Sequence, residues 1–257
     1  MLAIRTPIPR SSRVTLVVLS FLLPLAAWLV LSSSGMETAR YLPTPGEVFA
    51  AGVEMARSGE LWTDLWASTQ RVLIGFGLAV LVSVPLGILM GSFTAVQALF
   101  EPLIAALRYL PAPALIPLFL IWLGLDEPPK IALIFVGSVF FNTLMTADVV
   151  RQVPRALIDV SYTLGARPRE VLAKVIVPHS APGMIDAIRV NVAGAWALLV
   201  VAELVNSTTG LGRSIIQSQR FAQIDEMFVV LVVFGIIGVI TDAALRLLRS
   251  TVGRWAV

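Results

Sequence analysis

The chain has 257 residues, of which 57% are hydrophobic and only 14% are charged, and its net charge is +3. Soluble domains carry about 25% charged residues, so this composition excludes an ordinary soluble globular protein. The chain has no cysteine and a single histidine, so neither disulfides nor a thiolate or histidine-cluster metal site is expected. Membrane topology is sufficient to explain the small positive charge, and no nucleic-acid partner is expected.

Six apolar runs are long enough to cross a membrane, because a hydrocarbon core about 30 Å thick requires about 20 apolar residues per helix. Backbone groups in lipid must bond within their own segment, so each run is expected to be helical. The sequence therefore predicts an all-α, polytopic membrane protein with about six transmembrane helices. Residues 1–13 form a predicted cytoplasmic tail and residues 14–257 a single transmembrane domain. The predicted spans are Val14–Leu31, Val72–Met90, Leu103–Leu123, Ile131–Ala147, Met184–Val205 and Met227–Leu248.

The third predicted span is the least regular, because Pro111, Pro113 and Pro117 interrupt it. Proline removes a backbone donor and kinks a helix. In a membrane such a break is tolerated where the freed groups face protein or a cavity. The span is therefore expected either to line a cavity or to be a kinked packing helix, and the sequence leaves both alternatives open.

The distribution of Lys and Arg predicts the orientation of the chain. With a cytoplasmic N-terminus, eleven basic residues fall inside and six outside, as the positive-inside rule requires. Both termini and the loop at 148–182 are then cytoplasmic. The first apolar run follows Arg5, Arg10 and Arg13, which is typical of a signal peptide. Because this run is long and lacks a good cleavage site, it is interpreted as an uncleaved first span.

Two longer segments are predicted outside the membrane. Within 32–68, a turn at 41–46 precedes a helical pattern of Val48, Phe49, Val53 and Met55. This helix is expected at the outer surface, as a structural anchor or as a partner-binding element. Within 206–226, Gly210 and Gly212 predict a tight turn that opens a short helix; no βαβ pattern supports a nucleotide site there.

The cytoplasmic loop predicts two short helices joined by a glycine. Asp159 and Ser161 are residue types that open or cap a helix. Gly165 is expected to end the first helix in a left-handed conformation. Pro168 fits the first turn of a second helix running to about Val175, and Pro178 is expected to stop that helix before the fifth span. An amphipathic loop lying at the membrane surface would show a similar pattern.

This loop resembles the "EAA" loop of ATP-binding cassette importer permeases, which docks on the ATPase subunit. Asp159-Val160-Ser161 stands at the Glu-Ala-Ala position and departs from it at all three residues, although Asp keeps the carboxylate. Gly165, Ile176 and Pro178 match the remaining motif positions. The resemblance implies an ATPase-coupling loop at about 155–178. Its candidate coupling residues are Asp159, Val160, Ser161, Leu164, Gly165, Ala166, Arg169, Val171, Leu172, Ile176 and Pro178.

Short matches in order along nearly the whole chain extend the resemblance to the nitrate/sulfonate/taurine/bicarbonate branch of these permeases. They are weak individually and specific together. The matching stretches are Leu42–Pro45, Ser58–Trp62, Ser68–Phe76, Pro85–Gly87, Leu107–Pro111, Ile121–Gly124, Ala195–Trp196 and Ala202–Glu203.

The resemblance implies the type I importer fold in a bacterial inner membrane. Two permease subunits, as a homodimer or with a similar chain as the second subunit, would form the pathway for a small anionic solute such as a sulfonate, nitrate or taurine. ATPase subunits would bind the loops, and an extracytoplasmic binding protein would deliver the solute. The chain contains no Gly-x-x-x-x-Gly-Lys-Ser/Thr loop, so ATP and Mg²⁺ are expected on the separate ATPase. The permease itself is expected to bind no cofactor and to catalyse no reaction.

Polar and irregular residues inside the spans are candidates for the pathway or its gate. Arg108 is expected either to attract an anion or to reach the headgroups. Glu203 is expected to pair with an arginine such as Arg71 or to contact substrate. The candidates are Arg108, Pro111, Pro113, Asn142, Asn191, Trp196 and Glu203. Of these, Asn142 and Asn191 are expected to hydrogen-bond between helices.

Two alternatives to the importer remain open. An ion-gradient-driven secondary transporter or channel would explain the six spans but not a docking loop, and no internal repeat supports it. An intramembrane enzyme would require a nucleophile–base or paired-carboxylate arrangement, which the sequence does not show. Near the inner membrane face, pairs are expected between Asp186 and Arg189 and between Asp242 and Arg246.

Overall fold

The computed structural model describes residues 9–34, 41–205 and 207–253, and every regular element in these ranges is helical. Five helical runs are long and apolar enough to cross a membrane, and a sixth crossing consists of two helices bent by 82°. The all-α, polytopic prediction is therefore confirmed. The five runs are α1 (Arg10–Ser32), α3 (Glu60–Ser92), α6 (Pro128–Arg151), Pro168–Val205, which includes α9 (Val177–Val205), and α11 (Ile224–Val252). Arg5, Arg40, Asn206 and Arg254 lie outside the described residues.

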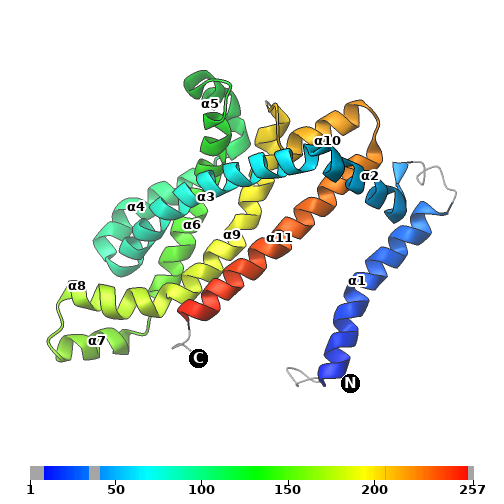
Figure 1. Cartoon of the computed structure of the whole chain (residues 1–257). Helices are drawn as coiled ribbons and strands as arrows, with labels where there is room; N and C mark the ends of the chain where they lie inside the picture. The colour runs from blue at the N-terminus through cyan, green and yellow to red at the C-terminus, as the bar shows by residue number, and fades with distance from the viewer. Residues whose placement is uncertain (1–8, 35–40, 206, 254–257) are drawn as a thin grey trace.

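The first helix, α1, stands apart from the others along most of its length (Figure 1) and has no buried residue. Its C-terminal part makes contact through Trp28, which stacks on Phe228 of α11 with ring centroids 5.7 Å apart. The Trp28 indole N–H also donates to the Pro43 carbonyl at 2.9 Å. An all-round apolar, unburied helix is the form expected for a segment surrounded by lipid.

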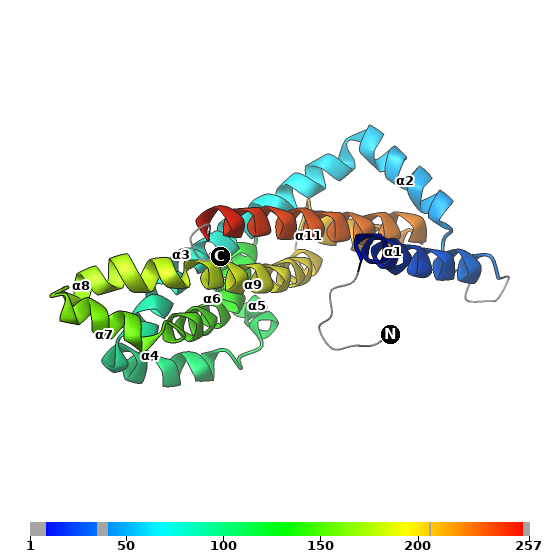
Figure 2. The same cartoon turned by 90° about the horizontal axis from the view of Figure 1, so that it is seen from below.

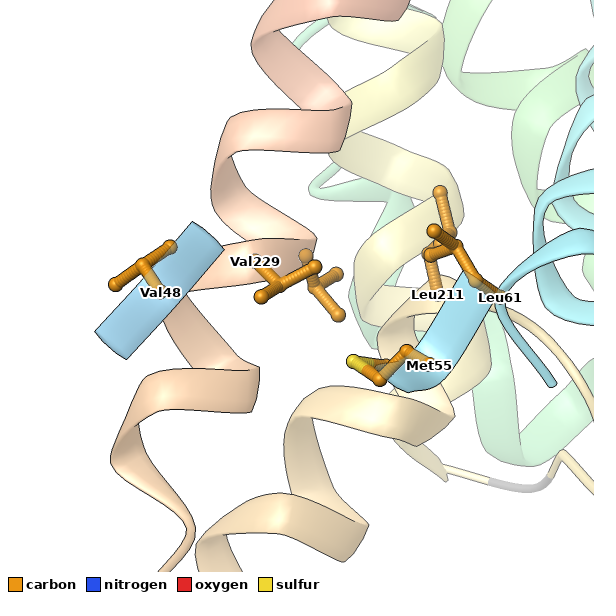
Figure 3. Close-up of a cluster of buried hydrophobic side chains, with 6 residues drawn as sticks. Val48, Met55, Leu61, Leu211 and Val229 are labelled. Carbon is orange, nitrogen blue, oxygen red and sulfur yellow. The ribbon is translucent and has the colours of Figure 1, made fainter. Parts of the chain in front are cut away.

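The surface helix predicted after the turn at 41–46 is α2 (Pro45–Ser58). Thr44 accepts from the Glu47 N–H at 3.3 Å while Glu47 accepts from the Thr44 N–H at 2.7 Å, which is a complete capping box. Val48 and Met55 are buried with residues of α3, α10 (Leu211–Arg220) and α11, and Figure 3 shows this cluster. Phe49 is 74% exposed, so only part of the predicted apolar face packs inward. The cluster packs α2, α3, α10 and α11 against one another at the end of the molecule opposite α7 and α8.

The second predicted span is part of a longer helix, because α3 begins at Glu60, twelve residues before Val72. It packs closely against α6. A Cβ on Gly87 would lie 2.6 Å from Thr146 Cβ, and one on Gly91 would lie 2.6 Å from Val150 Cβ. Glycine at these positions lets the two backbones approach, as in other membrane helix pairs.

The third predicted span is wrong as a single helix. It is divided into α4 (Thr94–Leu107), a 3₁₀ turn η2 (Ala112–Leu115) and α5 (Ile116–Leu123). Pro111 and Pro113 lack backbone N–H donors, and a residue that precedes a proline avoids the helical conformation. The predicted interruption is therefore confirmed, and the angle of 82° between the two helices is larger than that of an ordinary helix kink.

The loop after α6 contains α7 (Arg155–Thr163) and α8 (Pro168–Val171). The expectation that Asp159 and Ser161 open a helix is wrong, because both lie inside α7, which Pro154 precedes. The expectation that Pro178 stops the second helix is also wrong. A π turn, η3 (Leu172–Ile176), joins α8 directly to α9. Pro178 has no backbone N–H to donate, and the wider turn lies immediately before the first turn of α9, which contains Pro178.

Different short helices lie at the two ends of the molecule. In Figure 1, α7 and α8 lie at the same end as the first turn of α1 and the last turn of α11, while α2, α5 and α10 lie at the other end. Seen from below, α7 and α8 extend beyond the helical bundle (Figure 2). Arg249 near the end of α11 contacts Asp186 of α9 at 2.8 Å. The start of α1 and the end of α11 therefore lie at the end of the molecule that carries the loop.

Candidate functional site

The loop α7–α8 ends its first helix as the sequence predicted. Gly165 has a φ of +83°, a left-handed conformation that glycine adopts without strain. The Ala166 N–H donates to the Ser161 carbonyl at 3.0 Å and the Gly165 N–H to the Tyr162 carbonyl at 2.9 Å. These two bonds form a Schellman motif. The turn therefore fixes the angle between α7 and α8 through the backbone.

One face of α7 is apolar and faces solvent. Leu157, Val160 and Leu164 follow one another at helical spacing on this face and are 42%, 57% and 82% exposed. The opposite side of the loop packs inward, where Ile158 meets a cluster built around the buried Val171 and Ile176. An apolar face projecting beyond the bundle has the character of a protein-binding surface.

A shallow groove of about 390 Å³ runs between α7 and the α8–η3 segment. It is lined by Leu164, Gly165, Glu170 and Lys174 among others. Glu170 accepts from the Arg167 N–H at 2.9 Å and so caps α8. The groove therefore combines an apolar rim with one acidic and one basic side chain.

The predicted coupling residues fall into two groups by burial. Val171 and Ile176 are buried and hold the loop together, while Ser161, Ala166, Leu172 and Pro178 are half-buried. The remaining members are exposed and available to a partner; they are Asp159, Val160, Leu164, Gly165 and Arg169.

A second feature is a cavity of about 600 Å³ inside the bend between α4 and α5. It brings together four of the predicted pathway residues, Arg108, Pro111, Pro113 and Asn191. Its other walls come from α6 and α9 and include Ser138, which the sequence analysis did not single out. The predicted interruption of the third span thus lines a cavity, one of the two alternatives left open.

The remaining pathway candidates lie elsewhere. Trp196 lines a different pocket and packs edge-on against Phe234 of α11, with centroids 6.1 Å apart. Asn142 is fully buried and neither amide atom has a hydrogen-bond partner among the described residues, so its predicted bond between helices is wrong. Asn191 does reach across, with its Nδ2 3.1 Å from the Met145 sulfur of α6.

Glu203 belongs to a buried polar network at the end of the bundle opposite α7 and α8. Its Oε1 lies 2.6 Å from Arg71 Nη1, so the predicted pairing is confirmed. Arg71 also binds Glu127 in the loop before α6, with distances of 2.5 and 2.7 Å to the two carboxylate oxygens. The hydrogen bonds from Arg71 lower the pKa of Glu127 to about 2. Two acidic residues therefore balance one buried arginine and the adjacent Lys130, which lies 3.0 Å from Glu127.

The same network holds the start of α10. Asp64 accepts from the Gly210 N–H at 2.7 Å, and Ser68 accepts from the Leu211 N–H at 2.9 Å. Asp64 and Ser68 were not among the residues predicted from the sequence, although their spacing with Arg71 places all three on one helical face. That spacing is the signal that could have identified the network.

The predicted turn at Gly210 and Gly212 opens α10 and is shaped by Glu203. A Cβ on Gly210 would lie 2.4 Å from Glu203 Oε1, and one on Gly212 would lie 2.8 Å from Glu203 Cβ. The Gly212 N–H donates to Glu203 Oε2 at 2.7 Å. Glycine is required here for close approach to a buried carboxylate.

At the opposite end, ion pairs connect α9 with α11. The predicted pairs are confirmed, with 3.5 Å between Asp186 and Arg189 and 2.5 Å between Asp242 and Arg246. Arg189 also contacts Asp242 across the two helices. These ion pairs join the part of α9 nearest the loop to α11.

Residues 83–254 match the family described as binding-protein-dependent transport system inner membrane component. The chain belongs to this family. It is 37% identical over 237 residues to a probable ABC transporter permease protein of Brucella melitensis, covering 92% of this chain and 95% of that one. It is 31% identical to the taurine transport system permease protein TauC of Escherichia coli K12, covering 96% and 92%. The expected sulfonate/taurine branch of ABC importer permeases is thus confirmed.

Solved structures support the same fold. The chain is similar to a subunit in an inward-facing structure of the MetNI methionine ABC transporter, with a TM-score of 0.66 and 19% identity. The match covers 74% of this chain and 94% of that subunit. This permease therefore has the type I importer fold, which the resemblance implied.

Proposed function

We propose that this permease couples ATP hydrolysis on a separate ATPase to the import of a small anionic solute. In this proposal α7 and the adjoining groove dock on the ATPase, with ATP and Mg²⁺ bound there. A second copy of the chain completes the pathway, and an extracytoplasmic binding protein delivers the solute. The loop and both termini then lie in the cytoplasm.

The observation that carries this proposal is the exposed apolar face of α7. Leu164 and Val160 are exposed at the end of the bundle, where hydrogen bonds within the backbone hold the turn. Exposure of these apolar side chains to water is unfavourable. Covering them with a partner removes apolar surface from water at roughly 25 cal/mol per Å². Arg169 and the Glu170–Lys174 pair supply charged groups beside this face.

The continuous run from α8 through η3 into α9 supports a mechanism for the coupling. When the ATPase pair closes, it would draw the two docking loops together. Because no flexible linker separates α8 from α9, the displacement would tilt α9 and, through the Arg189–Asp242 contact, α11. The ATPase shifts the equilibrium between two permease states only if it binds them with different affinities.

The choice of solute class rests on the relatives and on charge. TauC is named as a taurine transport permease, and taurine carries a sulfonate group. The cavity at the α4–α5 bend contains Arg108 and no acidic residue among those that line it. Both observations favour an anionic group on the solute, such as a sulfonate or nitrate.

Co-purification tests the docking step directly. The chain is expressed with the ATPase encoded beside its gene, and the complex is isolated in mild detergent. We expect Leu164→Ala and Val160→Asp to reduce recovery of the ATPase. Phe221→Ala is the matched control, because Phe221 is a 70% exposed apolar residue at the end of the bundle opposite the loop.

Loss of the ATPase in the loop variants with retention in the control would support the proposal. Equal recovery in all variants would show that docking does not use α7. Failure of the folded wild-type chain to bind any ATPase would instead favour the ion-gradient-driven carrier or channel.

A further inference from the structure

We infer that Arg108 and Ser138 form a binding site for the anionic group of the transported solute in the cavity at the α4–α5 bend. The inference rests on the proposed function and extends it, because it assigns the charge selectivity of the pathway to two named residues. The ligand chemistry is a multi-oxygen anion, such as a sulfonate.

Arg108 differs from the other arginines inside the bundle in having no carboxylate partner. Arg71, Arg151 and Arg189 each contact an acidic side chain, whereas Arg108 forms no ion pair within the described residues. Its Nη2 donates to the hydroxyl of Tyr109 at 3.1 Å and its guanidinium lies 5.0 Å from the Tyr109 ring centroid. Its Nε is buried and has no partner in the described part of the chain.

Ser138 supplies the second, independent observation. It lies on α6, lines the same cavity and is only 4% exposed. Its hydroxyl has no hydrogen-bond partner among the described residues. A buried polar group without a partner is costly, so a ligand acceptor at this position would satisfy a donor that the protein leaves unused.

The chemistry of the two donors fits an oxyanion. The planar guanidinium presents parallel N–H groups that bind two oxygens at once, and the serine hydroxyl can donate to a third. Asn191 is not part of this donor set, because its Nδ2 is already directed to Met145 and to the Ala187 carbonyl. The volume of about 600 Å³ lies within the range of small-molecule sites.

Gly194 offers a steric test at the same cavity. It lies on α9 among the residues that line the cavity, and an added Cβ there would meet no atom within 4 Å, so Gly194→Leu adds a side chain at a position that is open at its Cβ. Gly238 on α11 is equally unobstructed and does not line the cavity. Gly238→Leu is therefore the matched control, and both changes raise helix propensity.

Binding is measured on the purified full-length chain by thermal unfolding with ethanesulfonate, and with the uncharged ethanesulfonamide for comparison. Ethanesulfonate is expected to raise the unfolding temperature of the wild type and of Gly238→Leu. The rise is expected to be smaller in Arg108→Lys and Ser138→Ala and absent in Arg108→Gln and Gly194→Leu. The sulfonamide is expected to have no such effect. Equal shifts in Arg108→Gln and wild type, or no wild-type shift, would overturn the inference.

Uptake by the reconstituted complex provides the second measurement. In Arg108→Gln we expect the KM for ethanesulfonate to rise at least about tenfold, the loss expected for a charged hydrogen bond. A wild-type KM in this variant would overturn the inference and leave the proposed function intact. A wild-type complex without ATP-driven uptake would overturn the proposed function, while the unfolding experiment still decides the anion site.

A lipid phosphate could occupy the same donors, so uptake is compared in vesicles of phosphatidylcholine alone and with added phosphatidylglycerol. A defect of Arg108→Gln in both compositions supports the solute as ligand. A defect that appears only with the anionic lipid would assign Arg108 to a headgroup and overturn the inference.

Discussion

Arg71 of α3 and Glu203 of α9 form a buried salt bridge, with 2.6 Å between Nη1 and Oε1 and side-chain exposures of 3% and 0%. Ser68 donates to the same carboxylate oxygen at 2.8 Å. The two residues are 132 positions apart in the chain, and their contact joins α3 to α9. It also explains why an acidic residue stands in the middle of an apolar run.

Removing one member of this pair is expected to destabilise the protein strongly. Glu203→Gln leaves the buried arginine with only Glu127 as a charged partner, at a cost of about 3 kcal/mol. The unfolding temperature in detergent measures the effect. Lys174→Gln is the control, because Lys174 is exposed and its ion pair is worth less than about 1 kcal/mol. Equal stability of the two variants would contradict a stabilising role for the pair.

The contribution of Glu127 is expected to depend on pH. Arg71 lowers the pKa of Glu127 from 4.5 to about 2. A carboxyl whose pKa is lower in the folded state stabilises fully above its unfolded pKa and loses this effect as the pH falls toward its folded pKa. The stability difference between wild type and Glu127→Gln is thus expected to be constant from pH 8 to 5, then to decrease below about 4.5. A difference independent of pH down to 3 would contradict this assignment.

Gly165 allows the geometry of the docking loop to be tested separately from its side chains. Valine at φ +83° is strained by more than about 1–2 kcal/mol, so Gly165→Val is expected to disrupt the Schellman turn and uncouple ATP hydrolysis from uptake. Asparagine tolerates the left-handed conformation, so Gly165→Asn is expected to retain coupling. No atom lies within 4 Å of the added Cβ, so the strain acts through the backbone alone. The ratio of ATP hydrolysed to solute imported distinguishes the two, and full coupling in Gly165→Val would refute the prediction.

Gly210 tests the anchoring of α10. Gly210→Ala places a Cβ 2.4 Å from Glu203 Oε1 at a φ of +123°, which is expected to cost more than about 1 kcal/mol. In contrast, Gly235→Ala on α11, where the space is open, is expected to be neutral or slightly stabilising. Unfolding in detergent compares the two variants. Equal unfolding temperatures for the two variants would show that the close approach of Gly210 to Glu203 does not contribute to stability.

The sequence alone determined the features that depend on local chemistry. Hydropathy located the apolar spans, because each must contain its own backbone hydrogen bonds. Gly165 predicted the turn, because glycine can adopt a positive φ. Pro168 predicted the start of α8, because proline restricts φ to a helical value. A carboxylate within an apolar segment predicted a compensating charge such as Arg71 or a contact with substrate, and the structure shows the pairing with Arg71.

Only the tertiary structure decided which distant residues meet. The bend of 82° between α4 and α5 determines that Arg108 faces a cavity also lined by Ser138 of α6. Asp64 binds the Gly210 N–H across 146 residues; its spacing with Ser68 and Arg71 marks a polar helix face, but does not show which distant residues that face meets. The continuation of α8 into α9 past Pro178 also depends on a π turn that sequence rules for proline do not anticipate. The local residue chemistry determines where the helices form, whereas long-range packing determines the cavity and the polar network.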